Sequence, residues 1–227
     1  ALYEKVASSD WSIPSVQYEQ FEVLREGKRY RAAANAAERL MRRFKNDPIV
    51  RDLPLQLARL YIRHLSQSKK AQRLIQRVLR EDETNTQALV LMAELYLADG
   101  KAKKAVAYLT PIAERAEQAE QIDDYIAFVT QIASIWHDHL GDDTQALAWY
   151  ERILDKQPGH FESLQRIVSL YRQKSNWEAA SWALKRLITT AERSDDYAKE
   201  DLARRYVELA ELTKHLETSD DELIVLL

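Results

Sequence analysis

The chain has 227 residues, of which 46% are hydrophobic and 30% charged, with four glycines, five prolines and a formal net charge of −3. It is rich in good helix formers, which is typical of a helical protein. It has no cysteine, which excludes disulfides and thiolate metal ligands. The sequence contains no run of about eighteen apolar residues, so no membrane-spanning helix is predicted.

A small residue recurs along the chain at a spacing of 34 residues. Ala37, Ala71 and Ala105 follow one another at this interval, and Ala146 and Ala180 repeat it further on. Self-similarity at a period of this length is the sequence signature of a helix–turn–helix array. One helix pair alone cannot bury its apolar face, so neighbouring pairs must stack. The period therefore predicts an all-α fold.

Taken in chain order, the apolar periodicity predicts five helix pairs and a terminal helix. In the clearest unit, apolar residues fall at i, i+3, i+4, i+7 and i+8 from Leu89 to Leu97, and Gly100 ends that helix. All four glycines lie between such segments, as expected of helix–helix connections. The expected pairs cover residues 15–48, 51–83, 86–120, 121–158 and 160–193, and the terminal helix covers 196–216.

The regular spacing breaks once. The step from Ala105 to Ala146 is 41 residues, seven more than the repeat, which corresponds to about two helical turns. Pro111 lies inside the helix that would carry the extension, where proline kinks a helix or removes a backbone hydrogen bond. We therefore expect longer helices between Lys101 and Leu140 and a change of superhelical curvature there.

The end of the chain is similar to the start of a further helix. Ser219 and the three acidic residues after it match a helix N-cap and first turn, and five apolar residues follow. We therefore expect a truncated helix at 219–227. Since that helix would be cut after about one turn, we also expect the chain to be a piece of a longer protein, and any targeting signal could lie in the missing parts.

The segment from Gly141 to Pro158, GDDTQALAWYERILDKQP, is the best match to a known family. It has a glycine turn, then Ala146, a large apolar residue four positions later, and a terminal Gln-Pro; Ala133 and an aromatic three positions later precede it. This pattern resembles the tetratricopeptide repeat family over roughly residues 15–216, in an Ala-rich style that looks like large bacterial repeat proteins. The resemblance implies one right-handed superhelical solenoid of antiparallel helix pairs across 1–227, acting as a non-catalytic protein-binding scaffold.

In this family the first helix of each pair lines a concave groove that holds an extended peptide or a partner helix. The Lys/Asn clamp by which chaperone-binding members grip a carboxylate is absent from the corresponding positions here. Arg59, Arg63 and Arg172 are nevertheless suited to bidentate hydrogen bonds with carboxylates, and the apolar positions are suited to an amphipathic helix. Contact with neighbouring repeats is the alternative for each position. The groove candidates are Leu55, Arg59, Ile62, Arg63, Val90, Glu94, Leu97, Thr130, Ser134, His137, Gln165, Ser169 and Arg172.

The small net charge hides a strong asymmetry. Residues 25–80 carry 16 Lys and Arg against four Asp and Glu, whereas residues 81–227 carry 16 against 28. The open interpretations are charge drift without a partner, an acidic protein partner, and contact between opposed ends of two copies. Nucleic acid is disfavoured, because Tyr30 and Tyr61 occupy repeat core positions rather than stacking positions. The candidate basic patch is Arg39, Arg42, Arg43, Lys69, Lys70, Arg73, Arg77 and Arg80.

No motif argues for catalysis, a cofactor or a metal. His137, Asp138 and His139 are possible ligands, but a structural zinc site needs four, and no other His or Cys repeats the spacing. These histidines end a predicted helix, where they interact favourably with its dipole. The chain also lacks a Gly-rich phosphate loop and a nucleophile–base arrangement.

The predicted function is therefore a non-catalytic scaffold that binds a peptide or helix of another protein. Self-assembly through the basic 25–80 and acidic 81–227 ends is one alternative, and binding of an anionic surface or nucleic acid through 25–80 is another. Trp149 and Trp182 would form a second contact patch if exposed. The compartment is unknown, with the cytoplasm favoured.

Overall fold

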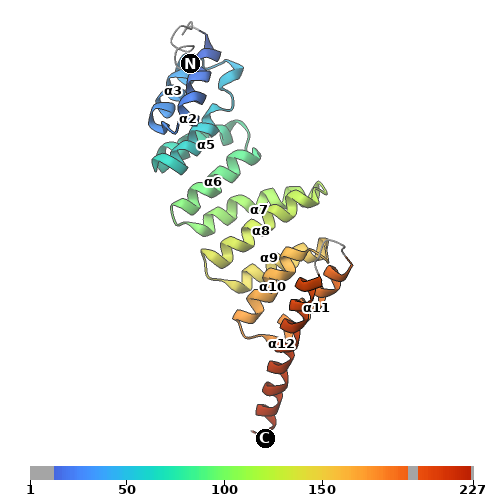
Figure 1. The fold of residues 1–227 in the computed structure, drawn as a ribbon. Helices are drawn as coiled ribbons and strands as arrows, with labels where there is room; N and C mark the ends of the chain where they lie inside the picture. The colour runs from blue at the N-terminus through green and yellow to red at the C-terminus, as the bar shows by residue number, and fades with distance from the viewer. Residues whose placement is uncertain (1–12, 194–198, 226–227) are drawn as a thin grey trace. The chain divides into compact units, whose positions relative to one another are not determined.

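A computed structural model describes the backbone of residues 13–193 and 199–225, and the regular structure in these ranges is entirely helical (Figure 1). The described side chains are those of 13–193 and 199–216. The chain divides into two compact units, residues 1–112 and 113–227, which are considered separately. Within the described ranges, no helix is long and apolar enough to cross a bilayer. The predicted all-α class is confirmed.

Unit 1 contains helices joined by short turns. A 3₁₀ turn, η1, precedes α4, and a single π-helical turn, η2, continues α4 at its C-terminal end. The last helix, α7, begins in unit 1 and ends in unit 2. The elements are α2 (Pro14–Glu26), α3 (Tyr30–Arg43), η1 (Pro48–Val50), α4 (Leu53–Leu60), η2 (Tyr61–Leu65), α5 (Ser68–Glu81), α6 (Thr86–Ala98) and α7 (Ala102–Gln118).

Unit 2 continues with helices that pack on their sequence neighbours. Helix α8 packs on α9, α10 packs on α9 and α11, and α11 packs on α12. The elements are α8 (Ile122–Asp138), α9 (Asp143–Lys156), α10 (Phe161–Gln173), α11 (Trp177–Glu192) and α12 (Lys199–Val225). In this unit α8 contacts α9 and α10 contacts α11, while the repeat bounds and the continuity of all pairs as one solenoid stay predictions.

The alanines that define the 34-residue period lie in the cores of the units. Each is 0% exposed, which leaves no room for a larger side chain beside it. A methyl side chain permits close approach of two helices, and larger apolar residues such as Tyr61 and Tyr150 fill the adjoining space. The period-defining alanines are Ala37, Ala71, Ala105, Ala146 and Ala180.

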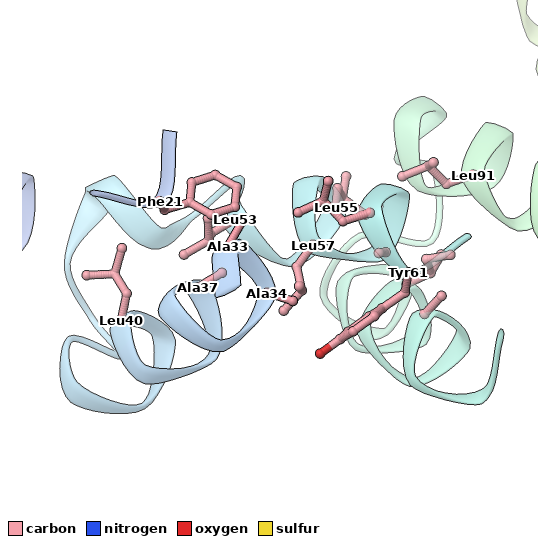
Figure 2. Close-up of a cluster of buried hydrophobic side chains, with 14 of the residues drawn as sticks. Phe21, Ala33, Ala34, Ala37, Leu40, Leu53, Leu55, Leu57, Tyr61 and Leu91 are labelled. Carbon is pink, nitrogen blue, oxygen red and sulfur yellow. The ribbon is translucent and has the colours of Figure 1, made fainter. Parts of the chain in front are cut away.

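Figure 2 shows how this packing works in unit 1. Phe21 of α2 lies against the small residues Ala33 and Ala37 of α3, while Leu57 and Tyr61 approach α3 from the next pair. The buried set continues into α5 and α6 through Ile75 and other apolar residues. Each helix pair therefore completes the core of its neighbour.

The helix ends follow from polar and glycine residues at the turns. The side chain of Asn85 accepts a hydrogen bond from Ala88 N at 2.9 Å, and that of Asp142 accepts from Gln145 N at 3.0 Å. Such caps satisfy backbone donors at a helix N-terminus. Gly100 adopts a left-handed φ of +70°, a conformation that glycine tolerates without a steric penalty.

The extension predicted between Lys101 and Leu140 is present as two longer helices. Helices α7 and α8 each have 17 residues, whereas α6 has 13 and α9 has 14. Pro111 lies inside α7, and the helix continues through it. Its ring nitrogen has no N–H to donate to the preceding turn. Next to it, Thr110 Oγ1 donates to the Val106 carbonyl at 2.9 Å.

The C-terminal helix differs from the sequence expectation. A helix ending at 216 and a new one beginning at 219 were expected, but α12 runs without a break from Lys199 to Val225. Neither glycine nor proline occurs in residues 217–222, so nothing in that stretch forces the helix to end. Ser219 therefore lies within a helix and not at its N-cap.

Candidate functional site: the first-helix faces and the basic face

In unit 1 the groove candidates lie on α4, η2 and α6, the first helices of two successive pairs. Ile62, Val90 and Leu97 are half-buried and keep apolar surface in contact with solvent. Leu55 is only 8% exposed and belongs to the buried cluster, where Figure 2 shows it. Leu55 must therefore be removed from the candidate set, because its side chain is used in the core.

Arg63 and Glu94 form a salt bridge between these two first helices. Arg63 Nη2 lies 2.9 Å from Glu94 Oε1 and 3.1 Å from Oε2, and Arg63 Nε donates to Oε2 at 3.3 Å. A guanidinium held in this way is already satisfied by a carboxylate. Arg63 is therefore not free to bind a partner's carboxylate unless this bridge opens. Arg59 is exposed and has no ion-pair partner in the described part of the chain.

In unit 2 several groove candidates also make internal contacts. Ser134 Oγ lies 3.4 Å from the Tyr150 hydroxyl, and His137 Nδ1 lies 2.6 Å from Asp143 Oδ1. Arg172 pairs with Glu208 of α12. These three side chains link a first helix to a neighbouring helix, which was the alternative expectation for such positions.

The remaining candidates of unit 2 are polar and differ in exposure. Thr130 of α8 is half-buried, whereas Gln165 and Ser169 of α10 are exposed. None of the three offers apolar surface of the kind seen in unit 1. The candidate positions of the two units therefore differ in chemistry: among them, those of unit 1 combine apolar side chains with Arg59, which has no ion pair with a described residue.

The predicted basic patch is fully accessible. All eight of its side chains are exposed, on the second helices α3 and α5. Two of them have ion pairs: Lys70 with Glu38 at 3.4 Å, and Arg77 with Glu81 at 3.7 Å. We call these eight residues the basic face: Arg39, Arg42, Arg43, Lys69, Lys70, Arg73, Arg77 and Arg80.

A hydrogen-bonded cluster fixes α3 to the following pair. Tyr61 donates its hydroxyl proton to Glu38 Oε1 at 2.6 Å, and Lys70 Nζ lies 5.2 Å from the centre of the Tyr61 ring. The bond from Tyr61, with a further contribution from Lys70, lowers the pKa of the Glu38 carboxyl. Burial, together with the Glu38 carboxylate, raises the pKa of Tyr61. Glu38 is thus an anion within an otherwise basic surface.

Two other surfaces carry apolar groups. Trp182 of α11 is 51% exposed, and the guanidinium of Arg186 lies 4.9 Å from its ring centre. Trp149 is half-buried, so the expected tryptophan patch reduces to Trp182. Tyr206 and Val207 of α12 are exposed as well, which sequence periodicity did not single out.

The described side chains provide no cluster of three or more metal-ligand types. His137 uses Nδ1 for Asp143, while His139 is exposed at the end of α8. His160 caps α10, since its Nδ1 accepts from Ser163 N at 3.3 Å, and burial lowers its pKa despite the opposing charge of Glu162. Each histidine therefore has a local structural environment rather than a shared site.

These features define a class of protein: an all-α repeat protein built from antiparallel helix pairs with small residues at the helix contacts. A tetratricopeptide repeat family model matches residues 66–127. A comparison with curated proteins finds no match. Residues 66–127 therefore match a tetratricopeptide repeat, and the fold of the chain resembles that of tetratricopeptide repeat proteins.

Solved structures support the same fold. A tetratricopeptide repeat protein from Parabacteroides merdae ATCC 43184 is similar with a TM-score of 0.59 and 16% identity, over 92% of this chain and 79% of that one. The MamA protein is similar with a TM-score of 0.58 and 16% identity, over 82% of this chain and 96% of that one. At these identities the likeness concerns the fold alone.

Proposed function

We propose that this protein is a non-catalytic scaffold whose first-helix face in unit 1 binds a helix or extended peptide of a partner protein. Tetratricopeptide repeat proteins are generally protein-interaction scaffolds. The observation that supports this site is the half-exposed apolar set on two successive first helices, Ile62, Val90 and Leu97, together with the exposed Arg59.

The chemistry of this face favours an amphipathic partner. Apolar side chains spaced along two adjacent helices accept the apolar stripe of a partner helix. Arg59 would then hydrogen-bond an acidic side chain beside that stripe. Arg63 lies at the same face, but its guanidinium is paired with Glu94 and does not bind a second carboxylate of the partner. The proposed ligand is therefore mainly apolar, with one acidic residue.

A peptide-display selection tests this site. The whole chain is the bait, and selected peptides are measured by fluorescence anisotropy against the Ile62→Asp/Leu97→Asp variant. Placing two carboxylates on the apolar face should weaken binding by about thirtyfold or more, since each buried charge is costly. The matched control is Ala107→Asp/Ala148→Asp, which adds the same charges at exposed positions of second helices.

The controls distinguish a variant that is folded but no longer binds from a variant that is unfolded. Circular dichroism and the urea midpoint of each variant are measured first, so that only folded proteins are compared. Selected peptides that bind the Ile62→Asp/Leu97→Asp variant as tightly as the wild type would show that this face is not the binding site. Failure to select any peptide above background would also count against the proposal.

Self-assembly is the second candidate function, because all eight cations of the basic face are exposed while residues 81–227 carry the excess of acid. Binding of nucleic acid has weaker support. Tyr30 stacks on His64, with ring centres 3.7 Å apart, and Tyr61 is buried, so neither ring is available for base stacking.

A further inference from the structure

The basic face consists of cations on α3 and α5, two second helices that both pack against α4. Arg39 of α3 is followed by cations three and four residues later, and on α5 the cations from Lys70 to Arg80 are three or four residues apart, which is about one helical turn. Glu38 of α3 bridges to Lys70 of α5. A hollow between the same two helices is lined by Glu38, Met41, Arg42, Lys45 and Arg77. The cations of the two helices therefore form one continuous surface.

Most of these cations form no ion pair with a residue that the structure describes. Of the eight, only Lys70 and Arg77 have an ion pair among the described residues, and both of those pairs are exposed to solvent. Like charges one turn apart on a helix repel each other, and exposed ion pairs compensate only weakly. A surface that keeps six such cations together is electrostatically complementary to an acidic ligand.

The hollow adds an apolar component to this charge. Met41 is half-buried and lies between cationic side chains of α3 and α5. A flexible thioether adapts to an inserted apolar group, which makes it suited to recognising amphipathic segments. Within the described parts of α3 and α5, no aromatic ring is exposed for stacking on a base. This combination favours an acidic protein segment over nucleic acid.

We propose that the basic face is a second interaction surface, separate from the first-helix face, that binds an acidic amphipathic segment of a partner protein. Carboxylates one helical turn apart in the ligand would pair with the arginines of α3 and α5, because guanidinium groups bind carboxylates in a bidentate manner. One apolar side chain of the ligand would lie against Met41. Most of the affinity is therefore electrostatic, and the apolar contact with Met41 fixes how the bound segment is aligned along α3 and α5.

A designed peptide tests this chemistry directly. The probe is a fluorescent helical peptide of about sixteen residues, with glutamates one turn apart on one side and a single leucine between them. Fluorescence anisotropy with the whole chain should detect binding that falls steeply between about 50 and 200 mM salt. A matched peptide with lysine in place of every glutamate should not bind.

Paired variants assign the binding to this surface. Arg42→Glu/Arg77→Glu reverses the two arginines that line the hollow and should weaken binding by about thirtyfold or more, from the loss of two charge-assisted pairs. The control Lys103→Glu/Arg166→Glu makes the same charge change at exposed positions on α7 and α10, and should change binding by less than about threefold. Equal weakening by both pairs would mean that only net charge matters, and would overturn the assignment.

Further measurements decide between classes of partner. Met41→Ser should weaken the peptide by about fivefold at any salt concentration, since it removes apolar contact. If a DNA duplex of about twenty base pairs binds as tightly as the peptide and Met41→Ser has no effect, the surface is a nucleic-acid site instead. If the chain alone self-associates in sedimentation and Arg42→Glu/Arg77→Glu abolishes this, a second copy is the occupant. Absence of peptide binding overturns the proposal.

Discussion

At the residue scale, the period-defining alanines control how closely the helices approach. Ala71 is 0% exposed on α5. Ala71→Leu adds three carbon atoms to a site with no free volume and should lower the free energy of unfolding by about 1–3 kcal/mol. Ala107→Leu, at an exposed position of α7, should change it by less than about 0.5 kcal/mol. Urea titrations of both variants give the comparison, and equal effects would contradict a packing role for Ala71.

The Tyr61–Glu38 hydrogen bond makes a second prediction at this scale. Tyr61→Phe removes the donor at 2.6 Å from the carboxylate and should cost about 1 kcal/mol of unfolding free energy at neutral pH. The folded-state pKa of Glu38 is lowered, so this stability is present above the ordinary glutamate pKa of 4.5 and is lost as the pH falls through the lowered value. Urea titrations at neutral pH and at about pH 3 should therefore show the difference shrinking in acid. A stability difference between the wild type and Tyr61→Phe that is the same at both pH values would mean that the hydrogen bond does not depend on the ionisation of Glu38.

At the element scale, left-handed residues end several helices. Gly100 has φ +70°, and a Cβ built there would meet no atom within 4 Å. Gly100→Ala therefore introduces backbone strain without a clash, and should cost about 1 kcal/mol in urea unfolding. Gly100→Asn should cost less, because asparagine tolerates the left-handed region better. A stability unchanged by either substitution would indicate that this turn adopts another conformation.

Helix positions were predictable from sequence because alanine spacing and glycine turns are local signals. Contacts between successive helix pairs were not predictable from sequence, because they join residues far apart in the chain. The repeat pattern placed Arg63 and Leu55 on one face of their helix. It did not show that Arg63 would pair with Glu94, 31 residues away, or that the core would cover Leu55. The π-helical turn at Tyr61–Leu65 was also missed. Such a turn accommodates one extra residue within a helix.

The continuity of α12 has a similar explanation. Serine followed by acidic residues marks a helix start only where the chain before it leaves the helical conformation. Residues 217–222 contain no helix-breaking residue, so the same letters are compatible with a helix interior. The exposure of the eight cations of the basic face, in contrast, agrees with the sequence, because charged side chains on the outer faces of second helices remain in solvent.

At the scale of the whole molecule, the charge asymmetry leads to one more prediction. An excess of cations at residues 25–80 and of acids at 81–227 would drive copies together end to end if their surfaces matched. Met41 lines the hollow of the basic face. Attraction between opposite charges alone would not require an apolar side chain there. If the basic face binds an acidic segment of another protein, as proposed, the chain alone should remain a monomer, whereas the self-assembly alternative predicts association. Light scattering after size exclusion should give a mass near 26.4 kDa at every protein and salt concentration tested.

The salt dependence makes this experiment decisive. Attraction between exposed charges weakens as the Debye length falls from about 30 Å at 0.01 M salt to about 8 Å at 0.15 M. A mass that rises with protein concentration in low salt and returns to that of the monomer in high salt would identify the opposed ends as an interface. Reversal of Arg42 and Arg77 would then abolish the rise, whereas reversal of Lys103 and Arg166 would not. A constant mass instead leaves the basic face open to another protein, which is the condition that its proposed acidic partner requires.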